Sequence, residues 1–491
     1  MRSTIFGLGL VVGLTQAAAL NKRAALADCL AEAGTSIDEA DSDDWTLDTT
    51  PYNSLYPYTP DVIAVPTTEE QIQSAVVCGA QTGYKVTAKG GGHSYGSYGL
   101  GGEDGHLVIQ LDRMFGVKLD NETNIATVAP GTRLGHLAVE LWAQGKRAIA
   151  HGTCPGVGVA GHALHGGFGL NSHTHGLALD WIVGLNVVLA NGSLIHTSAD
   201  ENADIFWGML GAGSNFGVVT SFELDTFAPP ANLTWFVGNL PLKQENAVSG
   251  LEALQSYVLD TMPAELNMRV VGTQRMTQIE GIYYGNDTEL RAALAPFLNQ
   301  TGASILQTGT TDWPGSLQHF ATMTLNQTHP HTEQSTFYGK SLELSGLSGD
   351  VAENFVDYWF DYAKNVSGAW YFQLDLQGGK NSAVWNADSA LSSYAHRDKL
   401  YILQFFYRST EETIPDAGLK LVDEWTAETS KAIPDEDLAM YINYPDLSLN
   451  RTEAHKVYFG KNLPKLQQLK AELDPEELFY YPISINPKEA S

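Results

Sequence analysis

Two glycine-rich segments, residues 89–99 and 145–169, constrain the fold of this chain more than any other feature of its sequence. The first reads Lys89-Gly-Gly-Gly-His93 after a strand-like run, and the second holds eight of the 48 glycines. Consecutive glycines after a strand let backbone N–H groups converge on an anion such as a pyrophosphate. Because neither the G-x-G-x-x-G spacing nor the P-loop ending is present, the triplet alone is equally typical of an ordinary loop.

The histidines favour a cofactor site over an ordinary loop. Nine of the 14 histidines lie between His93 and His196, a density that packing alone does not explain. We therefore interpret the second segment as another wall of the same site, with Cys154 held at close backbone approach.

A metal site is the competing interpretation, because His162 and His165, or His173 and His175, are spaced as ligands could be. Zinc sites generally use three or four ligands that further hydrogen bonds orient. These histidines sit among glycines rather than on a helix face. We therefore expect no metal, and predict hydrogen-bonded polar groups in a loop-rich core.

Length and charge limit the architecture and the partners. A chain of 491 residues favours two domains or one elaborate domain. Its formal net charge is −28, from 28 Lys and Arg against 56 Asp and Glu. Nucleic acids and anionic membranes are therefore excluded as expected partners, because binding them needs clustered cations. A neutral or cationic small substrate is compatible, and we expect a monomer.

The N-terminus predicts secretion. Arg2 precedes an apolar run over residues 5–20, too short to span a bilayer, so we interpret residues 1–20 as a signal peptide with possible trimming after Arg23. Eight glycosylation sequons suit an extracellular protein; they are Asn121, Asn191, Asn232, Asn286, Asn299, Asn326, Asn365 and Asn450. The three cysteines then imply one disulfide and one remaining thiol.

Local patterns alternate between strands and helices, which predicts an α+β fold. A strand is expected at residues 62–65, and Thr67-Thr68-Glu69-Glu70 reads as a capping box that opens a helix closed by Cys78. Further strands are predicted at residues 107–111, 125–128, 187–190, 194–197, 218–224, 369–376 and 400–407, and helices after Thr132 and at residues 463–473. The pair Pro229-Pro230 suggests a domain boundary.

The glycine-rich segments resemble the flavin-binding segments of the vanillyl-alcohol-oxidase superfamily, in its berberine-bridge-enzyme-like branch. Within that branch the chain resembles fungal secreted glucooligosaccharide oxidases over essentially the whole mature length. Four further stretches carry this resemblance: Gly-Gly-Glu-Asp-Gly at 101–105, Gly-Gly-Lys-Asn-Ser at 378–382, Tyr-Ala-His-Arg-Asp at 394–398 and Tyr-Ile-Asn-Tyr-Pro-Asp at 441–446.

The resemblance implies three parts of the mature chain. Residues 24–228 would form a two-lobed FAD-binding domain of the PCMH type. Residues 229–439 would form a substrate domain with a large antiparallel sheet covered by helices. Residues 440–491 would form a berberine-bridge-like segment that returns to the FAD domain.

The resemblance also implies an FAD attached twice, through His93 and through Cys154, and a disulfide between Cys29 and Cys78. It assigns further cofactor-binding residues in and near the glycine-rich segments. These are Gly90, Gly91, Gly92, Ser94, Gly96, Ser97, Gly158, Gly161, His162, Gly166, Gly169 and Val219.

Two residues match the catalytic pair of the family, Tyr444 and Asp375. Oxidation of a reducing-end sugar removes the proton of the anomeric hydroxyl while a hydride leaves the same carbon. An unperturbed phenol titrates near ~10, so we expect Tyr444 to be assisted by a hydrogen bond to Asp375 that accepts proton density. Gln373 lies two residues from Asp375, so a strand places both side chains on one face.

Sugars suit aromatic platforms with a few amides and carboxylates, because they present apolar faces ringed by hydroxyls. The expected substrate-binding residues are Tyr95, Thr153, Glu280, Tyr371, Gln373, Gln404 and Tyr441, with Trp370 as a further candidate. Tyr371 or Trp370 alone is equally typical of an ordinary core. The family commonly has a second tryptophan at Tyr371, so the departure bears on the choice of oligosaccharide.

These observations favour a secreted flavoprotein that oxidises the anomeric carbon of β-1,4-linked gluco- or xylo-oligosaccharides to lactones and reduces oxygen to hydrogen peroxide. One alternative keeps the flavin, as a dehydrogenase with other acceptors or an oxidase of a secondary metabolite. Another is a secreted carbohydrate-binding protein or metal-dependent hydrolase without flavin.

Overall fold

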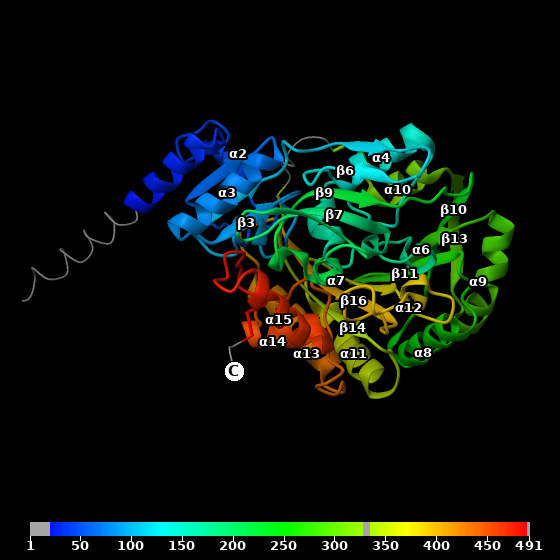
Figure 1. Ribbon diagram of the computed structural model, residues 1–491. Coiled ribbons are helices and arrows are strands. Elements are labelled where there is room, and N and C mark those ends of the chain that lie inside the picture. The colour runs from blue at the N-terminus through cyan, green and yellow to red at the C-terminus, as the bar shows by residue number, and fades with distance from the viewer. Residues whose placement is uncertain (1–19, 328–333, 489–491) are drawn as a thin grey trace, which may run out of the picture.

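The chain folds into three β-sheets with helices packed around them (Figure 1), which confirms the predicted α+β class. This computed structural model describes residues 20–327 and 334–488. Of the predicted signal peptide, residues 1–19 lie outside the described residues. Within the described part, no helix is long and apolar enough to cross a membrane.

The first sheet has four strands in the order β1 (Ser36–Asp38), β2 (Val62–Val65), β4 (Leu107–Gln110) and β3 (Val86–Lys89). β2, β4 and β3 run parallel and β4 is buried throughout, as expected of parallel strands covered on both faces. A helix over residues 20–32 and helix α3 (Glu69–Thr82) flank this sheet. A disulfide joins Cys29 to Cys78 and confirms the predicted pairing.

Helix α3 differs from its prediction at both ends. Its N-cap is Thr68, whose hydroxyl accepts the backbone N–H of Gln71, so the predicted capping pair was shifted by one residue. The helix also continues beyond Cys78 to Thr82. It ends only where Gly83 adopts the left-handed conformation with φ 72°, a geometry that glycine adopts without steric cost.

The second sheet has five antiparallel strands in the order β5 (Val117–Leu119), β6 (Ala126–Val128), β9 (Val218–Leu224), β7 (Ile182–Val188) and β8 (Leu194–Ser198). Helices α4 (Leu134–Gly145), α5 (Val159–Ala163), α6 (Ser172–His175) and α7 (Ala203–Ala212) connect its strands. The second glycine-rich segment lies between α4 and α6 and includes α5.

The third sheet has seven antiparallel strands in the order β13 (Ser304–Thr311), β10 (Leu233–Asn239), β12 (Thr277–Tyr283), β11 (Leu266–Thr273), β15 (Ala369–Leu376), β16 (Tyr401–Ser409) and β14 (Thr336–Leu344). This is the large antiparallel sheet that was predicted. Its helices are α8 (Gln244–Asp260), α9 (Asp287–Thr301), α10 (Trp313–Ala321), α11 (Gly349–Asp361), α12 (Ala383–Asn386) and α13 (Asp416–Ser430).

Strand alternation divides β15 between a core face and an open face. Phe372 packs edge-on against Phe355 of α11 and Trp425 of α13, so the even-numbered residues face these helices. Trp370 also meets Trp425 and is only 3% exposed, so its ring packs in the core. The odd-numbered residues therefore face the opposite side of the sheet, toward the first two sheets.

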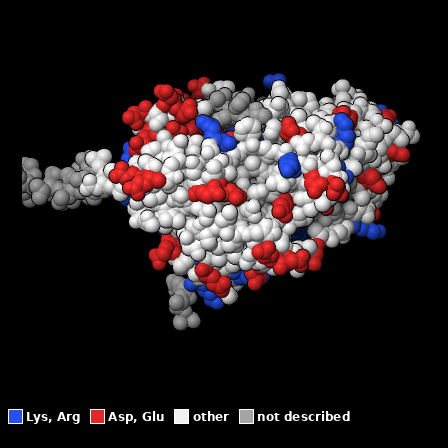
Figure 2. All heavy atoms as spheres, turned by 45° about the horizontal axis from the view of Figure 1, so that its top comes forward, with Lys and Arg blue, Asp and Glu red and all other residues white. Residues whose placement is uncertain are grey.

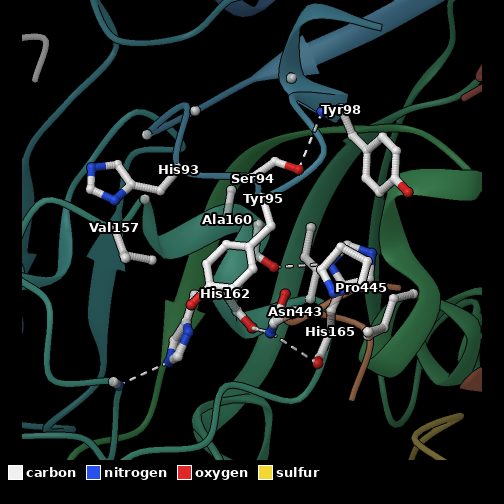
Figure 3. Close-up of a pocket in the computed structure, with 18 of the residues that line it drawn as sticks. His93, Ser94, Tyr95, Tyr98, Val157, Ala160, His162, His165, Asn443 and Pro445 are labelled. Carbon is white, nitrogen blue, oxygen red and sulfur yellow. Dashed lines mark hydrogen bonds between the residues drawn. The ribbon is translucent and has the colours of Figure 1, made fainter. Parts of the chain in front are cut away.

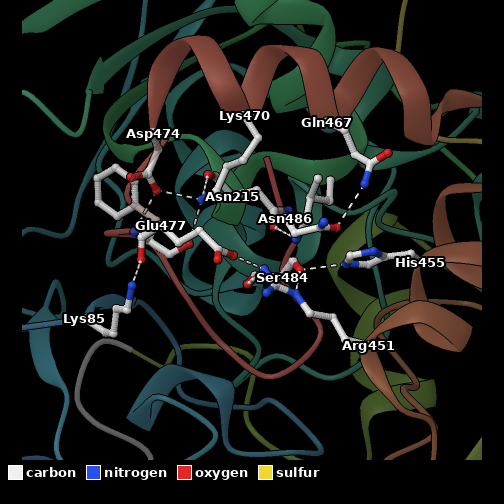
Figure 4. A network of polar contacts seen from close by, with 12 residues as sticks. Lys85, Asn215, Arg451, His455, Gln467, Lys470, Asp474, Glu477, Ser484 and Asn486 are labelled. Carbon is white, nitrogen blue, oxygen red and sulfur yellow. Dashed lines mark hydrogen bonds and ion pairs between the residues drawn. The ribbon is translucent and has the colours of Figure 1, made fainter. Parts of the chain in front are cut away.

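The C-terminal segment packs against the first part of the chain (Figure 1). It contains helices α14 (Arg451–Phe459) and α15 (Leu463–Leu473). The ammonium of Lys470, fully buried, donates to Asp474 and to the backbone carbonyl of Asn215, which precedes β9 (Figure 4). The backbone N–H of Val86 in β3 donates to Leu478, so the tail is hydrogen-bonded to the first sheet.

The remaining short elements are α2 (Trp45–Thr49) and the 3₁₀ turns η1 (Tyr98–Leu100), η2 (Ala178–Trp181), η3 (Gly213–Asn215), η4 (Ala363–Asn365) and η5 (Gly460–Asn462).

Candidate active site

A cavity of about 460 Å³, called here the inner cavity, lies between the two glycine-rich segments and the third sheet. Figure 3 shows side chains of the two glycine-rich segments and of the C-terminal loop that line it. Most of the predicted site residues line it. They are Gly90, Gly91, Gly92, His93, Ser94, Tyr95, Thr153, Cys154, Gly158, Gly161, His162, Gly169, Val219, Tyr371, Gln373, Asp375, Gln404, Tyr441 and Tyr444. Residues separated by more than 300 positions in sequence thus share one enclosed space.

The two glycine-rich segments touch through their backbones. A Cβ atom added to Gly91 would lie 2.2 Å from the backbone nitrogen of Gly158, so neither position accepts a side chain without a shift of the backbone. The guanidinium of the buried Arg133 donates to the carbonyl of Gly91 and to that of Gly156. Arg133 therefore links the two segments through hydrogen bonds to the backbone of each.

His93 and Cys154 lie on different segments, and both line the inner cavity. The His93 ring stacks on Tyr52, with 4.1 Å between ring centroids and 19° between planes. Cys154 is half-buried in the turn that precedes α5. The two side chains thus approach the same space from two loops that Arg133 connects.

The other histidines of the second segment are neutral polar groups. Nε2 of His162 accepts the backbone N–H of Gly152 at 2.9 Å, and burial lowers the pKa of His162 to about 3. His165 contacts the carbonyl of Gly161 at 2.9 Å, and burial lowers its pKa as well. Within residues 20–327 and 334–488, no group of three or more His, Cys, Asp or Glu could hold a metal ion.

The opposite wall of the inner cavity is the open face of β11, β15 and β16. On β15, the Gln373 amide donates to Oδ2 of Asp375 at 2.8 Å. Arg269 on β11 lies in register with Asp375 and donates to Glu280 on β12. Burial raises the pKa of Asp375 to about 6, although Arg269 and Gln373 oppose the shift. Asp375 is therefore ionised at neutral pH but holds its proton in mild acid.

Tyr444 lies beside this wall, between two aromatic rings. It stacks on Tyr95 with 5.4 Å between ring centroids, and meets Tyr441 edge-on at 5.1 Å. Burial first, and the Asp375 charge second, raise the pKa of Tyr444 well above its ordinary value, while Arg269 opposes them. The resting side chain is therefore a neutral phenol.

The predicted hydrogen bond between Tyr444 and Asp375 is not formed between these two described side chains. Gln373, which shares the strand face of Asp375, donates to its Oδ2 atom. What couples Tyr444 to Asp375 is the electrostatic field of the carboxylate across the cavity.

Gln404 on β16 completes the polar part of the wall. Its amide nitrogen donates to the Tyr95 hydroxyl at 2.8 Å, and its amide oxygen accepts the Tyr371 hydroxyl at 3.4 Å. The Tyr371 ring stacks on Phe406, with 4.9 Å between centroids and 19° between planes. Amides, a carboxylate and stacked rings therefore share one face, as a sugar site requires.

Tyr441 connects the C-terminal segment to the second glycine-rich segment. Its hydroxyl accepts the backbone N–H groups of Gly167 and Phe168, at 3.1 and 2.9 Å. Asn443 donates to the same hydroxyl and to the carbonyl of His165. The loop that carries Tyr444 is thus fixed directly to the wall that carries Cys154.

Four predicted site residues do not line the inner cavity: Gly96, Ser97, Gly166 and Glu280. Ser97 has φ 52° and is buried at the start of η1, and Gly166 has φ 103° beside Tyr394. An added Cβ at Gly96 would clash with Leu447. Glu280 lies on β12, one strand away from the cavity-lining strand β11, and accepts a hydrogen bond from Arg269. Glu280 therefore contributes to the site only through Arg269.

The residues of this site that sequence reasoning missed include Tyr52, Lys89, Arg133, Arg269, Phe406 and Asn443. Arg269 and Asp375 meet only through strand pairing between segments 106 residues apart in sequence. The alternation of Arg269 with the apolar Met268 and Val270 was the one available signal, since an isolated arginine in such a strand indicates a polar face.

Comparisons with known proteins agree with this geometry. Residues 60–198 match the family model described as FAD binding domain, and residues 440–486 match the model described as berberine and berberine like. A xylooligosaccharide oxidase from Thermothelomyces thermophilus is 48% identical over 475 residues, which cover 95% of each chain.

Two solved structures share the whole architecture. A xylooligosaccharide oxidase from Myceliophthora thermophila C1, in complex with xylobiose, superposes with a TM-score of 0.93 at 47% identity. A glucooligosaccharide oxidase from Acremonium strictum, described as carrying a 6-S-cysteinyl, 8α-N1-histidyl FAD, superposes with a TM-score of 0.92 at 40% identity. Each match covers 95% of this chain and 100% of the other.

Proposed function

The chain belongs to the berberine-like family of FAD-dependent carbohydrate oxidoreductases, and from this premise we propose that it oxidises the anomeric carbon of β-1,4-linked oligosaccharides to lactones. The observation that carries the proposal is the inner cavity, where His93 and Cys154 face a strand wall bearing Asp375 and Gln404. Water then opens the lactone to an aldonic acid. The acceptor in the proposal is oxygen, which is reduced to hydrogen peroxide.

The residues of the glycine-rich wall fit an FAD. Gly91 and Gly158 leave the backbone bare where the two segments meet, which suits the close approach of a pyrophosphate. His93 and Cys154 offer one nucleophilic atom each from separate loops, as the two attachments of the Acremonium strictum flavin require. We propose that the same two side chains hold the flavin of this chain.

When bound, FAD supplies the acceptor for the hydride that leaves the anomeric carbon. Tyr444 supplies the proton path, because its neutral phenol can accept a hydrogen bond from the anomeric hydroxyl and pass its own proton to a base. The hydrogen bond to that base must form when the sugar binds, since the described side chains do not make it. Asp375 is that base, and at neutral pH its ionised form takes the proton as the carbonyl forms. Arg269 supports this step by favouring the ionised Asp375.

The strand wall orients the sugar during this step. Gln373 and Gln404 offer amide groups to ring hydroxyls, and the stacked Tyr371 and Phe406 offer an apolar surface to a ring face. Near-attack geometry depends on such contacts, because a small misplacement of the anomeric carbon slows the reaction strongly. Tyr95 holds Gln404 and stacks on Tyr444, so it connects binding to proton transfer.

Secretion belongs to the same proposal. The signal-like N-terminus and eight sequons support it, and so does the Cys29–Cys78 disulfide, because such bonds persist in oxidising compartments. The family membership removes the alternative of a carbohydrate-binding or metal-dependent protein without flavin.

A peroxide assay across cello-, xylo-, malto- and chito-oligosaccharides tests the reaction. We expect stoichiometric peroxide and aldonic acid from at least one β-1,4-linked series. Dye reduction without peroxide would instead indicate a dehydrogenase, and no oxidation of any series would overturn the proposed substrate class.

Acid precipitation tests the proposed attachment. The wild-type flavin should stay with the pellet, and it should also do so in His93→Ala and in Cys154→Ala, because one link remains in each. The double variant should release its flavin into the supernatant. Release from the wild-type protein would overturn the attachment.

A further inference from the structure

A second cavity, called here the outer cavity, opens beside the inner one and has a volume of about 740 Å³. The two cavities share three lining residues, Tyr52, Tyr371 and Phe406. A ligand that starts at Asp375 can therefore continue past these rings into the outer cavity. If the chain oxidises oligosaccharides as proposed, the outer cavity receives the outer end of the substrate.

Three neighbouring strands build a continuous floor through both cavities. Along β16, Gln404 lines the inner cavity, Phe406 lines both, and Arg408 lines the outer one. These residues alternate along the strand, so their side chains share one face. At roughly 3.3 Å per residue, Gln404 and Arg408 are about 13 Å apart along the strand, which is the span of a few sugar rings.

The charges of the outer cavity are unusual for this protein. Two arginines line it, Arg408 on β16 and Arg275 in the turn between β11 and β12, and both are exposed. No Asp or Glu is among the described residues that line it. Elsewhere acidic residues dominate, as the face in Figure 2 shows with many Asp and Glu and few Lys and Arg.

These two arginines also differ from the others in the described part of the chain. Eight of the ten described arginines donate to a carboxylate, a hydroxyl or a backbone carbonyl: Arg23, Arg113, Arg133, Arg147, Arg269, Arg291, Arg397 and Arg451. Among the described residues, the guanidinium groups of Arg275 and Arg408 have no hydrogen-bond or ion-pair partner. The two arginines without such a partner, Arg275 and Arg408, thus line the same cavity.

The field of Arg408 reaches the aromatic floor. Burial raises the pKa of Tyr371, and the charges of Arg269 and Arg408 both oppose that shift. A ligand ring stacked on Tyr371 or Phe406 would therefore lie within reach of a positive charge. Guanidinium groups match carboxylates in shape, because two parallel N–H donors meet two oxygens.

We propose that the outer cavity binds the carboxylate of a uronic acid carried by the oligosaccharide, outward of the sugar whose anomeric carbon is oxidised. Arg275 and Arg408 provide the positive charge, and Tyr371 and Phe406 provide the surface for the sugar rings between. The natural substrates of this chain then include acidic, branched oligosaccharides. The absence of Asp and Glu among the described lining residues favours such a ligand, which the protein's net charge of −28 would otherwise repel.

Calorimetry with a blocked ligand tests this binding apart from oxidation. The ligand is the methyl β-glycoside of xylotriose with a glucuronic acid branch. The control ligand is the same compound with the uronate converted to its methyl ester, which removes the charge. Neither can be oxidised at the blocked anomeric carbon. We expect the flavin-loaded enzyme to bind the acid about tenfold more tightly than the ester in low salt. Raising the salt to roughly 1 M should remove most of the difference.

Charge-neutral variants locate the effect. In the double variant R275Q/R408Q the acid and the ester should bind equally. Arg291→Gln is the matched control, because it removes one charge from an exposed ion pair on α9, and it should keep the wild-type preference. Equal binding of acid and ester to the wild-type enzyme, or an unchanged preference in the double variant, would overturn the inference.

Turnover of the unblocked sugars separates this inference from the proposed function. If the reducing forms are oxidised without a preference for the acid, and binding shows none, the inference fails while the function stands. If the acid binds preferentially but neither reducing form is oxidised, the proposed function fails while the binding site stands.

Discussion

The two walls of the inner cavity are built by opposite means. The glycine-rich wall presents backbone, and its shape depends on the absence of side chains where Gly91 meets Gly158. The strand wall presents side chains, and its shape depends on alternation along β15 and β16. The first wall therefore tolerates no added atom where Gly91 meets Gly158, whereas the second can change its chemistry one residue at a time.

The two walls also differ in titration. Burial lowers the pKa of His162 to about 3 and also lowers the pKa of His151 and of His165, so these three histidines of the second glycine-rich segment are neutral at neutral pH. On the strand wall, burial raises the pKa of Asp375 to about 6. Activity should therefore take its acidic pH dependence from the strand wall.

The largest expected effect comes from adding one methyl group to the glycine-rich wall. Gly91→Ala would place Cβ against the backbone of Gly158, where no side chain can rotate away, at a cost of about 3 kcal/mol or more. We expect little flavin-loaded protein from this variant, measured by absorbance per mole of purified chain. Gly161→Ala is the control for folding, because its added Cβ meets no protein atom within 4 Å.

Equal flavin content and thermal stability in Gly91→Ala and the wild-type protein would contradict the view that this wall depends on bare backbone. Loss of folded protein in Gly161→Ala would do the same, since it would make any alanine in this segment harmful.

Tyr444→Phe should have the next largest effect, on turnover alone. Removal of the hydroxyl breaks the proton path, and we expect kcat to fall by about 10²- to 10⁴-fold with the flavin content unchanged. Tyr95→Phe is the comparison, because it keeps the ring beside Tyr444 and removes only the hydroxyl that holds Gln404. The Tyr95→Phe enzyme should lose activity mainly through a higher KM. A Tyr444→Phe enzyme with wild-type kcat would rule out the assigned proton path.

Asp375→Asn should lower kcat/KM by roughly 10- to 100-fold and change its pH profile. In the wild-type enzyme, kcat/KM should rise with pH through about 6, because only ionised Asp375 accepts a proton. The same raised pKa means that Asp375 stabilises the fold most below its unfolded value, near 3.8, and that this contribution is lost as pH rises through about 6. Asparagine does not titrate, so both dependences should disappear.

If Asp375→Asn keeps a rise in kcat/KM near pH 6, another group controls the reaction. The steady-state profile and thermal unfolding from pH 4 to 8 measure the two dependences separately, so a purely structural role would show in the second alone.

The smallest effect should come from Arg133→Lys. A lysine keeps the charge but cannot donate to both Gly91 and Gly156 in the present geometry, so one buried charged hydrogen bond is lost, at about 1–3 kcal/mol. We expect a lower Tm and slower flavin incorporation, with kcat of the loaded enzyme close to that of the wild type. An unchanged Tm would show that the segments hold together without Arg133.

Regular elements followed closely from local sequence. The predicted strands at residues 62–65 and 369–376 and the helix at 463–473 have the observed bounds, because each combines a strong hydrophobic pattern with clear ends. Helix α3 extended past its predicted end, because the stop signal is the left-handed Gly83 and not Cys78. Local chemistry thus sufficed where the end of an element is itself local.

The site was predictable only in part. The glycine and histidine density identified one wall, since bare backbone leaves a direct mark in the sequence. Arg269 was not identified, because its neighbour Asp375 comes from strand pairing that no local pattern reveals. The absence of the expected hydrogen bond between Tyr444 and Asp375 was not predictable for the same reason, since the exact reach of a side chain depends on tertiary packing.

The position of Tyr441 in the sequence has a consequence for the maturation of the protein. The Tyr441 hydroxyl binds Gly167 and Phe168 in the second glycine-rich segment, yet Tyr441 lies 274 residues after Gly167. During translation, both glycine-rich segments leave the ribosome long before Tyr441, and contacts across such separations form late. Maturation should therefore proceed in a fixed order, with the flavin pocket completed only after Tyr441 has been synthesised. A nascent chain that stalls before residue 440 would retain both attachment residues but lack the contact that holds their wall in shape.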